Sequence, residues 1–175
     1  MNEEQLIESC KRGDRIGQKE LYNRFSRKMM GVCYRYVNDK ETAADLLQEG
    51  FIKVFMSLKS YSGTGSFEGW VRKIFVNSAL EYLRKTDVLR EATDLDHMVE
   101  LSQPDSSVIS SMTADELMKL VQELPPGFRT VFNLFAIEGY SHREIGELLN
   151  ITESTSRSQY TRARQLLQKK INALH

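Results

Sequence analysis

Apolar residues recur at intervals of three and four along most of the chain, which is the spacing of amphipathic helices. No segment alternates with the period of two that marks a half-buried strand. We therefore expect an all-α protein. The segments with the helical spacing are a short stretch around residues 6–10, then residues 17–37, 42–58, 67–85, 113–124 and 128–137, and two more near the C-terminus.

Each predicted helix has one apolar side, and we expect these sides to form the core. Cys10 and Cys33 belong to no Cys-x-x-Cys pair, so we expect them to be small buried hydrophobic residues. The predicted core residues of the N-terminal half are Leu21, Phe25, Met29, Val32, Tyr36, Ala43, Leu46, Leu47, Gly50, Phe51, Val54, Phe55, Phe67, Val71, Ile74, Phe75 and Tyr82.

The stretch from Thr86 to about Ser111 has no sustained spacing of apolar residues and contains the turn-forming run Gln-Pro-Asp-Ser-Ser at residues 103–107. We expect it to separate two small helical domains. The predicted boundaries are residues 1–88 for the first domain, 89–111 for a flexible acidic linker and 112–175 for the second domain.

Near the C-terminus the pattern predicts two helices joined by a tight turn. Ser141 and Glu144 have the spacing of a capping box, so a helix is expected to begin there. Asn150 can adopt the left-handed backbone that ends it, and Thr152 can cap the next helix. The apolar positions of the first of these two helices are Ile145, Leu148 and Leu149.

The second of these helices is rich in basic residues, and a short helix followed by a longer basic one is the form of a DNA-binding helix-turn-helix. Two helices in a hairpin also occur in any all-α protein, so this pattern alone leaves plain packing open. The basic residues are Arg157, Arg162, Arg164, Lys169 and Lys170.

The formal net charge is zero, but the charges are segregated. Residues 1–85 carry 15 basic and 11 acidic side chains, residues 86–123 carry 2 and 9, and residues 124–175 carry 7 and 4. The two basic segments favour a polyanionic partner, whereas the acidic segment should avoid one or mimic one. A solvated tether between two domains explains the acidic segment equally well.

The sequence offers no candidate active site. His97, His142 and His175 are scattered and lie beside no plausible nucleophile or metal-ligand partner. The run Gly63–Ser66 lacks the lysine and the preceding strand of a phosphate-binding loop. No apolar run approaches the roughly 18 residues that span a bilayer, and no signal peptide is evident. We expect a cytoplasmic protein that is not an enzyme and uses no cofactor or metal.

Aromatic and basic residues alternate between residues 59 and 85. Rings can stack on unpaired bases while cations follow phosphates, so this mixture favours single-stranded nucleic acid. Helical spacing places Phe75 and Tyr82 in the core instead, and Trp70 is the best candidate for an exposed ring. The mixture comprises Tyr61, Phe67, Trp70, Phe75 and Tyr82 with Lys59, Arg72, Lys73, Arg84 and Lys85.

Three segments, in the order expected, resemble bacterial RNA polymerase sigma factors of the extracytoplasmic-function (ECF) group. Residues 45–51, Asp-Leu-Leu-Gln-Glu-Gly-Phe, resemble the region-two helix that binds the clamp coiled coil of the polymerase β′ subunit. Residues 66–77, Ser-Phe-Glu-Gly-Trp-Val-Arg-Lys-Ile-Phe-Val-Asn, resemble the promoter-melting helix. Residues 124–129, Leu-Pro-Pro-Gly-Phe-Arg, with Gly-Tyr-Ser at 139–141, resemble region four.

The resemblance implies a sigma factor that binds core RNA polymerase at the β′ clamp coiled coil and the β flap and directs promoter recognition and melting. Promoter DNA, as duplex and as melted strand, is the second implied partner. Whether a cognate anti-sigma factor exists stays open. We expect the free protein to be a monomer that does not insert into a membrane. The candidate contacts with core polymerase are Asp45, Leu46, Gln48, Glu49 and Ile52.

By the same resemblance, the loop from Tyr61 to Ser66 would capture a flipped base of the minus-ten element, and the helix after it would hold the unstacked strand. The candidate residues for this site are Tyr61, Ser62, Gly63, Ser66, Trp70, Lys73 and Asn77.

The last helix would read the minus-thirty-five element. Its positions 160, 163 and 167 are expected to turn inward, so its polar positions turn outward, with Arg157 suited to bases and Arg162 and Arg164 to phosphates. The candidate residues are Ser154, Thr155, Arg157, Ser158, Thr161, Arg162 and Arg164.

This last helix departs from the family pattern at two positions. It often begins Gly-Thr-Val-Lys/Arg-Ser-Arg-Leu in the family, whereas residues 154–160 here read Ser-Thr-Ser-Arg-Ser-Gln-Tyr. Ser156 stands where an apolar residue would pack inward, which could loosen the start of the helix. Gln159 replaces a frequent arginine, so the preferred upstream sequence stays open.

Two other functions remain as alternatives. A stand-alone transcriptional regulator would need only the C-terminal domain, and a protein-binding adaptor would leave the basic helices as solvated faces. Co-purification with core polymerase separates a sigma factor from both.

The acidic segment could pass through a basic channel of the polymerase, cover the basic faces of the free protein, or act as a tether. Replacing Asp94, Asp96, Glu100 and Asp105 with Asn or Gln would test these three roles.

Overall fold

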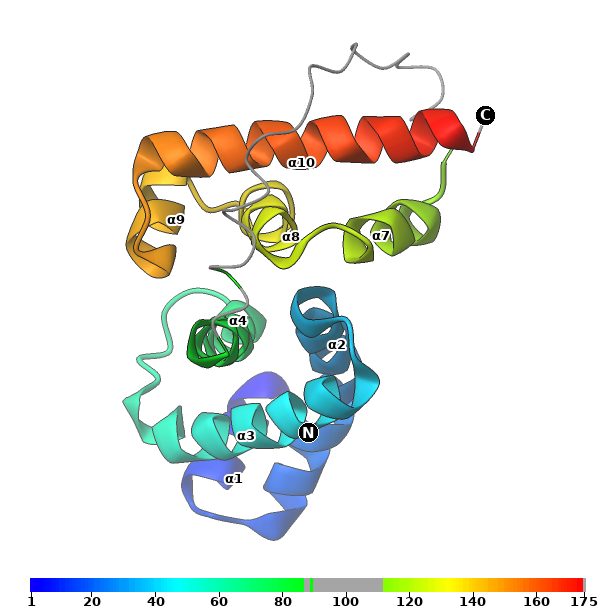
Figure 1. Ribbon diagram of the computed structural model, residues 1–175. Coiled ribbons are helices and arrows are strands. Elements are labelled where there is room, and N and C mark those ends of the chain that lie inside the picture. Colours follow the sequence, from blue (N-terminus) through cyan, green and yellow to red (C-terminus); the bar gives the residue numbers. More distant parts are fainter. Residues whose placement is uncertain (87–88, 90–111, 175) are drawn as a thin grey trace. The chain divides into compact units, whose positions relative to one another are not determined.

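The computed structural model describes residues 1–86, 89 and 112–174, and every regular element within these ranges is a helix (Figure 1). The helices form two compact units, Met1–Tyr82 and Leu83–His175. The expected all-α fold with two small helical domains is therefore confirmed. In the described part of the chain no helix is both long and apolar enough to cross a membrane. The hypotheses about Asp94, Asp96, Glu100 and Asp105 concern residues outside this part and stay predictions.

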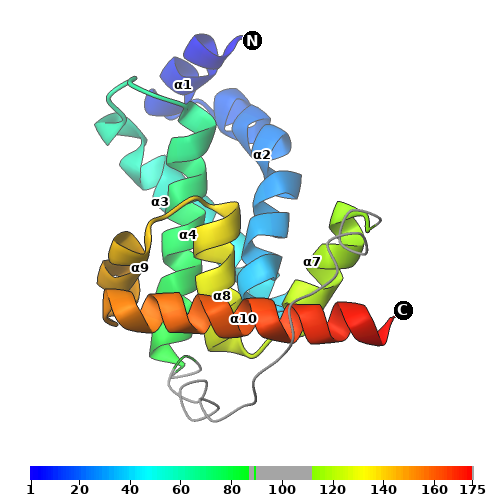
Figure 2. The same ribbon diagram turned by 90° about the horizontal axis from the view of Figure 1, so that it is seen from above.

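The N-terminal unit is a stack of helices in which α1 packs against α2 and α2 against α3 (Figure 2). The unit contains α1 (Glu3–Lys11), α2 (Arg15–Val37), α3 (Lys40–Ser57), the 3-10 turn η1 (Leu58–Ser60) and most of α4 (Phe67–Lys85).

Polar residues at the helix ends explain where these helices begin and end. The Asp14 side chain accepts a backbone hydrogen bond, so α2 begins at Arg15, two residues before the predicted start. Asp39 caps α3 in the same way, and α3 begins at Lys40. Between them, Asn38 has a φ of 53° and ends α2 with the left-handed backbone that asparagine tolerates.

Most of the predicted core of this unit is confirmed. Phe25, Phe55, Ile74 and Tyr82 are only half-buried, so for these four residues the prediction is wrong. The buried positions of α4 cover more than one side of the helix, which a single apolar stripe could not indicate. The core residues that the spacing missed there are Val76, Ala79, Leu80 and Leu83. Cys10 and Cys33 are buried and free, as expected, and burial raises the pKa of Cys33 to about 12.

Gly50 marks the tightest packing between α3 and α4. A Cβ atom at this position would lie 2.2 Å from Cε1 of Phe75, a distance that real side chains do not adopt. The Phe75 ring also packs edge-on against Phe51, with ring centroids 5.1 Å apart. The absence of a side chain at Gly50 therefore allows the two helices to pack at this ring.

The C-terminal unit is organised around α10, which runs past α7, α8 and α9 (Figure 1). Its elements are α7 (Ala114–Gln122), α8 (Pro126–Phe132), η3 (Asn133–Ile137), α9 (His142–Leu149) and α10 (Glu153–Ala173). An apolar cluster joins α7, α8 and α10; it consists of Leu120, Val121, Leu124, Phe128, Ala163, Leu167 and Ile171.

The segment predicted as one helix over residues 128–137 has two parts. α8 already begins at Pro126, because a proline in the first turn needs no backbone hydrogen bond. After Phe132 the chain continues as η3, which is π-helical. The amide of Glu138 donates to the carbonyl of Asn133 at 2.9 Å, five residues back. The wider turn changes the direction of the side chains that follow it.

Polar side chains also lie in the interior of this unit. Arg129 is 6% exposed, and its Nη1 donates to the carbonyl oxygen of Gln122 at 2.9 Å. Burial lowers the pKa of Arg129. The other buried polar residues among the described positions of this unit are Thr130, Asn133, Ser156 and Gln159.

Candidate nucleic-acid interface

Helices α9 and α10 form the predicted helix-turn-helix. Ser141 and Glu144 make the expected capping box at the start of α9. Asn150 ends α9 with a φ of 56°, and the Thr152 side chain caps α10. Gly146 allows the close turn, because a Cβ atom there would lie 2.7 Å from the carbonyl oxygen of Ile151. The expectations for Ser141 with Glu144, for Asn150 and for Thr152 are confirmed.

The first half of α10 presents a polar face to solvent. Ala163 and Leu167 are buried as expected, while Tyr160 is half-buried. The candidate upstream contacts Ser154, Arg157, Ser158, Thr161 and Arg164 are exposed, whereas Thr155 and Arg162 are half-buried. The face therefore carries two guanidinium groups and several hydroxyl groups without apolar side chains between them.

Arg157 on this face is paired within its own helix. Its Nη1 and Nη2 atoms lie 3.2 and 3.1 Å from Oε1 of Glu153, one turn earlier. Both side chains are about half exposed, so the pair contributes little to stability. The guanidinium of Arg164 lies 6.0 Å from the centre of the Tyr160 ring. Both arginines remain open to an external ligand.

Ser156, the departure from the family pattern, is fully buried at 0% exposure. Its Oγ lies 2.8 Å from Nδ1 of His142, the first residue of α9. α10 still begins at Glu153 with its cap in place, so the start of the helix is intact. This partner of His142 was not predicted, because a contact across 14 residues leaves no trace in local spacing.

His142 lies in an aromatic cluster. Its ring stacks on Phe135 with centroids 4.2 Å apart and an angle of 6° between the planes. Tyr160 contacts both, with centroids 4.6 Å from Phe135 and 5.7 Å from His142. Burial, followed by the charge of Arg157, lowers the pKa of His142, and Glu153 opposes this shift. These surroundings favour the neutral form of the imidazole.

In the N-terminal unit, the predicted minus-ten residues lie on one loop and one helix face. Ser62, Gly63 and Ser66 are exposed in the loop. The Oγ of Ser66 accepts a hydrogen bond from the amide of Gly69 at 3.1 Å and so caps α4. Lys73 and Asn77 are exposed one turn apart on α4. The loop thus ends at the start of a helix that carries the next candidates.

The aromatic candidates of this site are less exposed than expected. Tyr61 is 8% exposed, and its hydroxyl donates to the carbonyl of Gly65 at 3.3 Å. Trp70 is half-buried and packs against Tyr61 and Phe67, with centroids 5.2 and 5.9 Å apart. These contacts hold the loop against α4. Trp70 therefore offers only part of its ring to a ligand.

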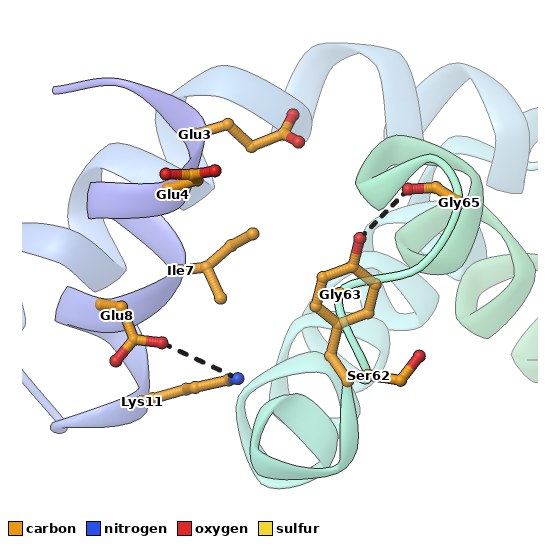
Figure 3. A pocket seen from close by; sticks show the side chains of 9 residues that line it. Glu3, Glu4, Ile7, Glu8, Lys11, Ser62, Gly63 and Gly65 are labelled. Carbon is orange, nitrogen blue, oxygen red and sulfur yellow. Dashed lines mark hydrogen bonds and ion pairs between the residues drawn. The ribbon is translucent and has the colours of Figure 1, made fainter.

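A pocket of about 380 Å³ separates this loop from α1 (Figure 3). Glu3, Glu4 and Glu8 line it on the α1 side together with Ile7 and Lys11, and the loop residues Tyr61, Ser62, Gly63 and Gly65 line the other side. The α1 residues of this pocket were not predicted, because they are remote from the loop in the sequence.

The predicted polymerase contacts lie on α3. Asp45, Gln48, Glu49 and Ile52 are exposed, and Ile52 is 58% exposed despite its apolar side chain. Leu46 is 2% exposed and packs inside the unit, so it does not belong to this exposed face. Met56, one turn beyond Ile52 and 79% exposed, extends the face and was not predicted.

Comparison with known proteins agrees with this arrangement. Residues 21–88 match Sigma-70 region 2, and residues 114–167 match Sigma-70, region 4. The chain is 30% identical to the ECF RNA polymerase sigma-E factor of Haemophilus influenzae over 99% of this chain and 97% of the relative. The chain belongs to the ECF sigma factors of RNA polymerase. It is 28% identical to the RNA polymerase sigma-H factor of Pseudomonas aeruginosa over 98% of this chain and 95% of the relative.

Two solved structures share the fold of this sigma factor. The Bartonella quintana sigma factor RpoE, in complex with the anti-sigma factor NepR, has a TM-score of 0.54 and 20% identity and covers 88% of this chain and 96% of its own. CnrH, in complex with the cytosolic domain of CnrY, has a TM-score of 0.52 and 17% identity and covers 96% of both chains. As a sigma factor, the protein acts with RNA polymerase in promoter recognition during transcription initiation.

Proposed function

We propose that this sigma factor uses three separate surfaces: the exposed face of α10 for the upstream promoter element, the loop after η1 with α4 for the melted minus-ten strand, and the exposed face of α3 for the β′ clamp. Residues 1–88 and 112–175 are the proposed domains, and the region-four domain would also bind the β flap. We also include an anti-sigma factor as a partner. One structural neighbour was solved in complex with the anti-sigma factor NepR, and the other in complex with the cytosolic domain of CnrY.

One observation carries the proposal for the upstream element. The helix-turn-helix exposes Arg157, Ser158 and Thr161 on one side of α10, while Ala163 and Leu167 lie in the core. A helix of this kind enters the major groove, where an arginine can donate two hydrogen bonds to guanine. The guanidinium of Arg157 would exchange its ion pair with Glu153 for such a contact.

The pocket beside the loop supports the proposal for the minus-ten strand. Its volume suffices for a group the size of a base, and Ile7 gives it an apolar surface. Three glutamates line it against one lysine, so a phosphate would be repelled there while an uncharged base would not. The backbone phosphates would instead follow Lys73 on the exposed side of α4.

The upstream assignment can be tested with core RNA polymerase and a promoter library. Arg157→Ala should relax the sequence preference at one or two upstream positions, because a bidentate contact to guanine contributes about 1–3 kcal/mol of discrimination. Arg164→Ala should weaken binding almost evenly across sequences and reduce the slope of log affinity against log salt by about 1. Arg143→Ala is the matched control, since Arg143 is exposed on α9 outside this face. Equal losses on selected and scrambled DNA for Arg157→Ala would exclude direct readout by this residue.

The polymerase contact needs a separate experiment. Gln48→Ala combined with Glu49→Arg changes only exposed side chains of α3, so helical circular dichroism should stay native. Binding to core polymerase should weaken in competition with another sigma factor. Lys40→Glu on the same helix is the control for charge reversal, because Lys40 is exposed and lies in the row of Leu47 and Phe51, outside the face of the proposed contact. Unchanged competition by the double variant would contradict the assignment.

A further inference from the structure

The contact between His142 and Ser156 joins the two helices of the helix-turn-helix away from the turn itself. His142 is the first residue of α9, and Ser156 lies in the first turn of α10. Their side chains meet at 2.8 Å between Nδ1 and Oγ. The turn at Asn150 connects the same helices through the backbone. The side-chain contact is thus a second connection between α9 and α10.

The imidazole is also fixed from a third element. The ring of Phe135 in η3 lies parallel to it at 4.2 Å, and Tyr160 of α10 contacts both rings. Stacking restricts the plane of the imidazole, and with it the direction in which Nδ1 faces Ser156. The geometry of the hydrogen bond therefore depends on packing that includes η3, α9 and α10.

The position of Ser156 gives this contact a functional consequence. Its neighbour Arg157 and the following Ser158 are exposed on the proposed reading face. A rotation of the first turn of α10 that moves Ser156 out of the interior would turn both of these side chains as well. Base contacts require placement within a fraction of an ångström, whereas phosphate contacts by long basic side chains tolerate more movement.

We propose that His142 and Ser156 form a positioning pair that sets the orientation of α10, and hence the direction in which Arg157 and Ser158 face the DNA. The proposal rests on the proposed role of α10 in reading the upstream element. In this view the polar pair serves sequence discrimination more than affinity for DNA as such. Neither side chain needs to touch DNA.

Serine in a helix can donate its hydroxyl to the carbonyl one turn earlier, which for Ser156 is the carbonyl of Thr152. Loss of the imidazole would therefore leave the hydroxyl satisfied but release its constraint on α9. We expect discrimination between the selected and a scrambled upstream element to fall about fivefold in Ser156→Ala, the size of one net hydrogen bond of ~1 kcal/mol. Affinity for scrambled DNA should change less than twofold.

The experiment uses the full chain with core RNA polymerase and an upstream duplex selected from a randomised library by the unchanged protein. His142→Phe keeps a ring against Phe135 but removes Nδ1, and His142→Asn keeps a polar group near Nδ1 but removes the ring. Because the pair acts as a unit, the double variant His142→Phe with Ser156→Ala should lose no more discrimination than either single variant. His142→Asn should recover part of the loss seen with His142→Phe.

A spectroscopic measurement distinguishes positioning from a general loss of stability. The ¹⁵N chemical shift of His142 Nδ1 should move in Ser156→Ala, while the amide spectrum of the rest of α10 stays that of a folded helix. Ser78→Ala is the matched control: Ser78 is a buried, hydrogen-bonded serine of the N-terminal unit, and its loss should change neither the shift nor the upstream discrimination.

Three results would overturn the proposal: discrimination unchanged in Ser156→Ala, losses that multiply in the double variant, or a His142 Nδ1 shift that does not respond to Ser156. Arg157→Ala separates this outcome from failure of the proposed function. If Arg157→Ala relaxes the upstream preference and Ser156→Ala does not, the positioning pair is excluded while the reading face stands. If Arg157→Ala leaves the preference unchanged, the reading face itself is excluded, and the positioning role with it.

Discussion

The N-terminal unit buries Tyr36, Phe67 and Phe75 almost completely, whereas the C-terminal unit buries Arg129 and Asn133 beside its apolar cluster. Among described residues, the buried polar side chains of the N-terminal unit are the two serines Ser9 and Ser78, and those of the C-terminal unit number five. Apolar contacts are non-directional and tolerate small shifts, while a buried hydrogen bond is satisfied in few arrangements. The interior of the N-terminal unit should therefore mainly determine its stability. The interior of the C-terminal unit should mainly determine how its helices are placed relative to one another.

The largest test of this comparison removes an aromatic ring from the N-terminal unit. Phe75→Ala should lower the free energy of unfolding of this unit by about 3–5 kcal/mol, because a cavity forms where the ring packs on α3. The single tryptophan, Trp70, lies in this unit, so its fluorescence during denaturant unfolding measures the change. Phe55→Ala, at a half-buried position, should cost clearly less. Equal losses in the free energy of unfolding for the two variants would mean that burial does not determine how much each ring stabilises the unit.

The corresponding test in the C-terminal unit is Arg129→Met. This change keeps much of the side-chain volume but removes the charged donor to the Gln122 carbonyl, and we expect a loss of about 1.5–3 kcal/mol. Hydrogen exchange of the α7 and α8 amides would detect it locally. Arg143→Met is the control, because Arg143 is exposed and surface changes stay within about 0.5 kcal/mol. A stabilised Arg129→Met variant would show that the buried guanidinium is dispensable for the fold.

Two glycines of the N-terminal unit test how tightly its apolar interior is packed. Gly50→Ala places a methyl group against the Phe75 ring and should destabilise the unit by about 1–3 kcal/mol. Gly31→Ala adds the same group inside α2, where nothing lies within 4 Å, and should stabilise it by about 0.5–1 kcal/mol. Both values follow from the Trp70 fluorescence transition. Changes of the same sign would contradict the packing at Gly50.

The smallest expected effect is a pH dependence of the C-terminal unit. Because folding lowers the pKa of His142, the folded state binds a proton less readily than the unfolded chain. This contribution to stability is complete above about pH 6.5, the ordinary value for histidine, and declines as the pH falls through the lower folded value. Arg157 strengthens the effect and Glu153 weakens it.

Hydrogen exchange of the α9 and α10 amides between pH 7.5 and 5.0 measures this dependence, with His142→Asn as the control that lacks the titrating ring. The slope of stability against pH should be smaller in His142→Asn than in the unchanged chain. An equal slope in both proteins would assign the effect to other groups.

The same contrast explains what the sequence could predict. The apolar repeat located the helices of both units, and the capping residues Ser141, Asn150 and Thr152 located the turn between α9 and α10. These features depend on neighbours within four residues, which local spacing records. The outward positions Arg157, Ser158 and Thr161 followed from the same repeat, because one side of α10 had to be buried.

Several of the missed features depend on distant parts of the chain. The partner of His142 lies 14 residues away, and the α1 side of the pocket lies at least 50 residues from the loop it faces. The half-burial of Tyr82 depends on which helices surround it. Local spacing carries no record of such contacts.

The π-helical segment η3 has a consequence for insertions and deletions in this chain. An α-helix turns by about 100° per residue, so one residue more or less rotates everything that follows by that angle. η3 absorbs an additional residue within a single turn and thereby sets the rotational phase of Phe135. Deleting one residue of η3 ahead of Phe135, either Asn133 or Leu134, would return the segment to an α-helical repeat while turning Phe135 away from His142. The chain length of this turn thus specifies which side chain reaches the helix-turn-helix.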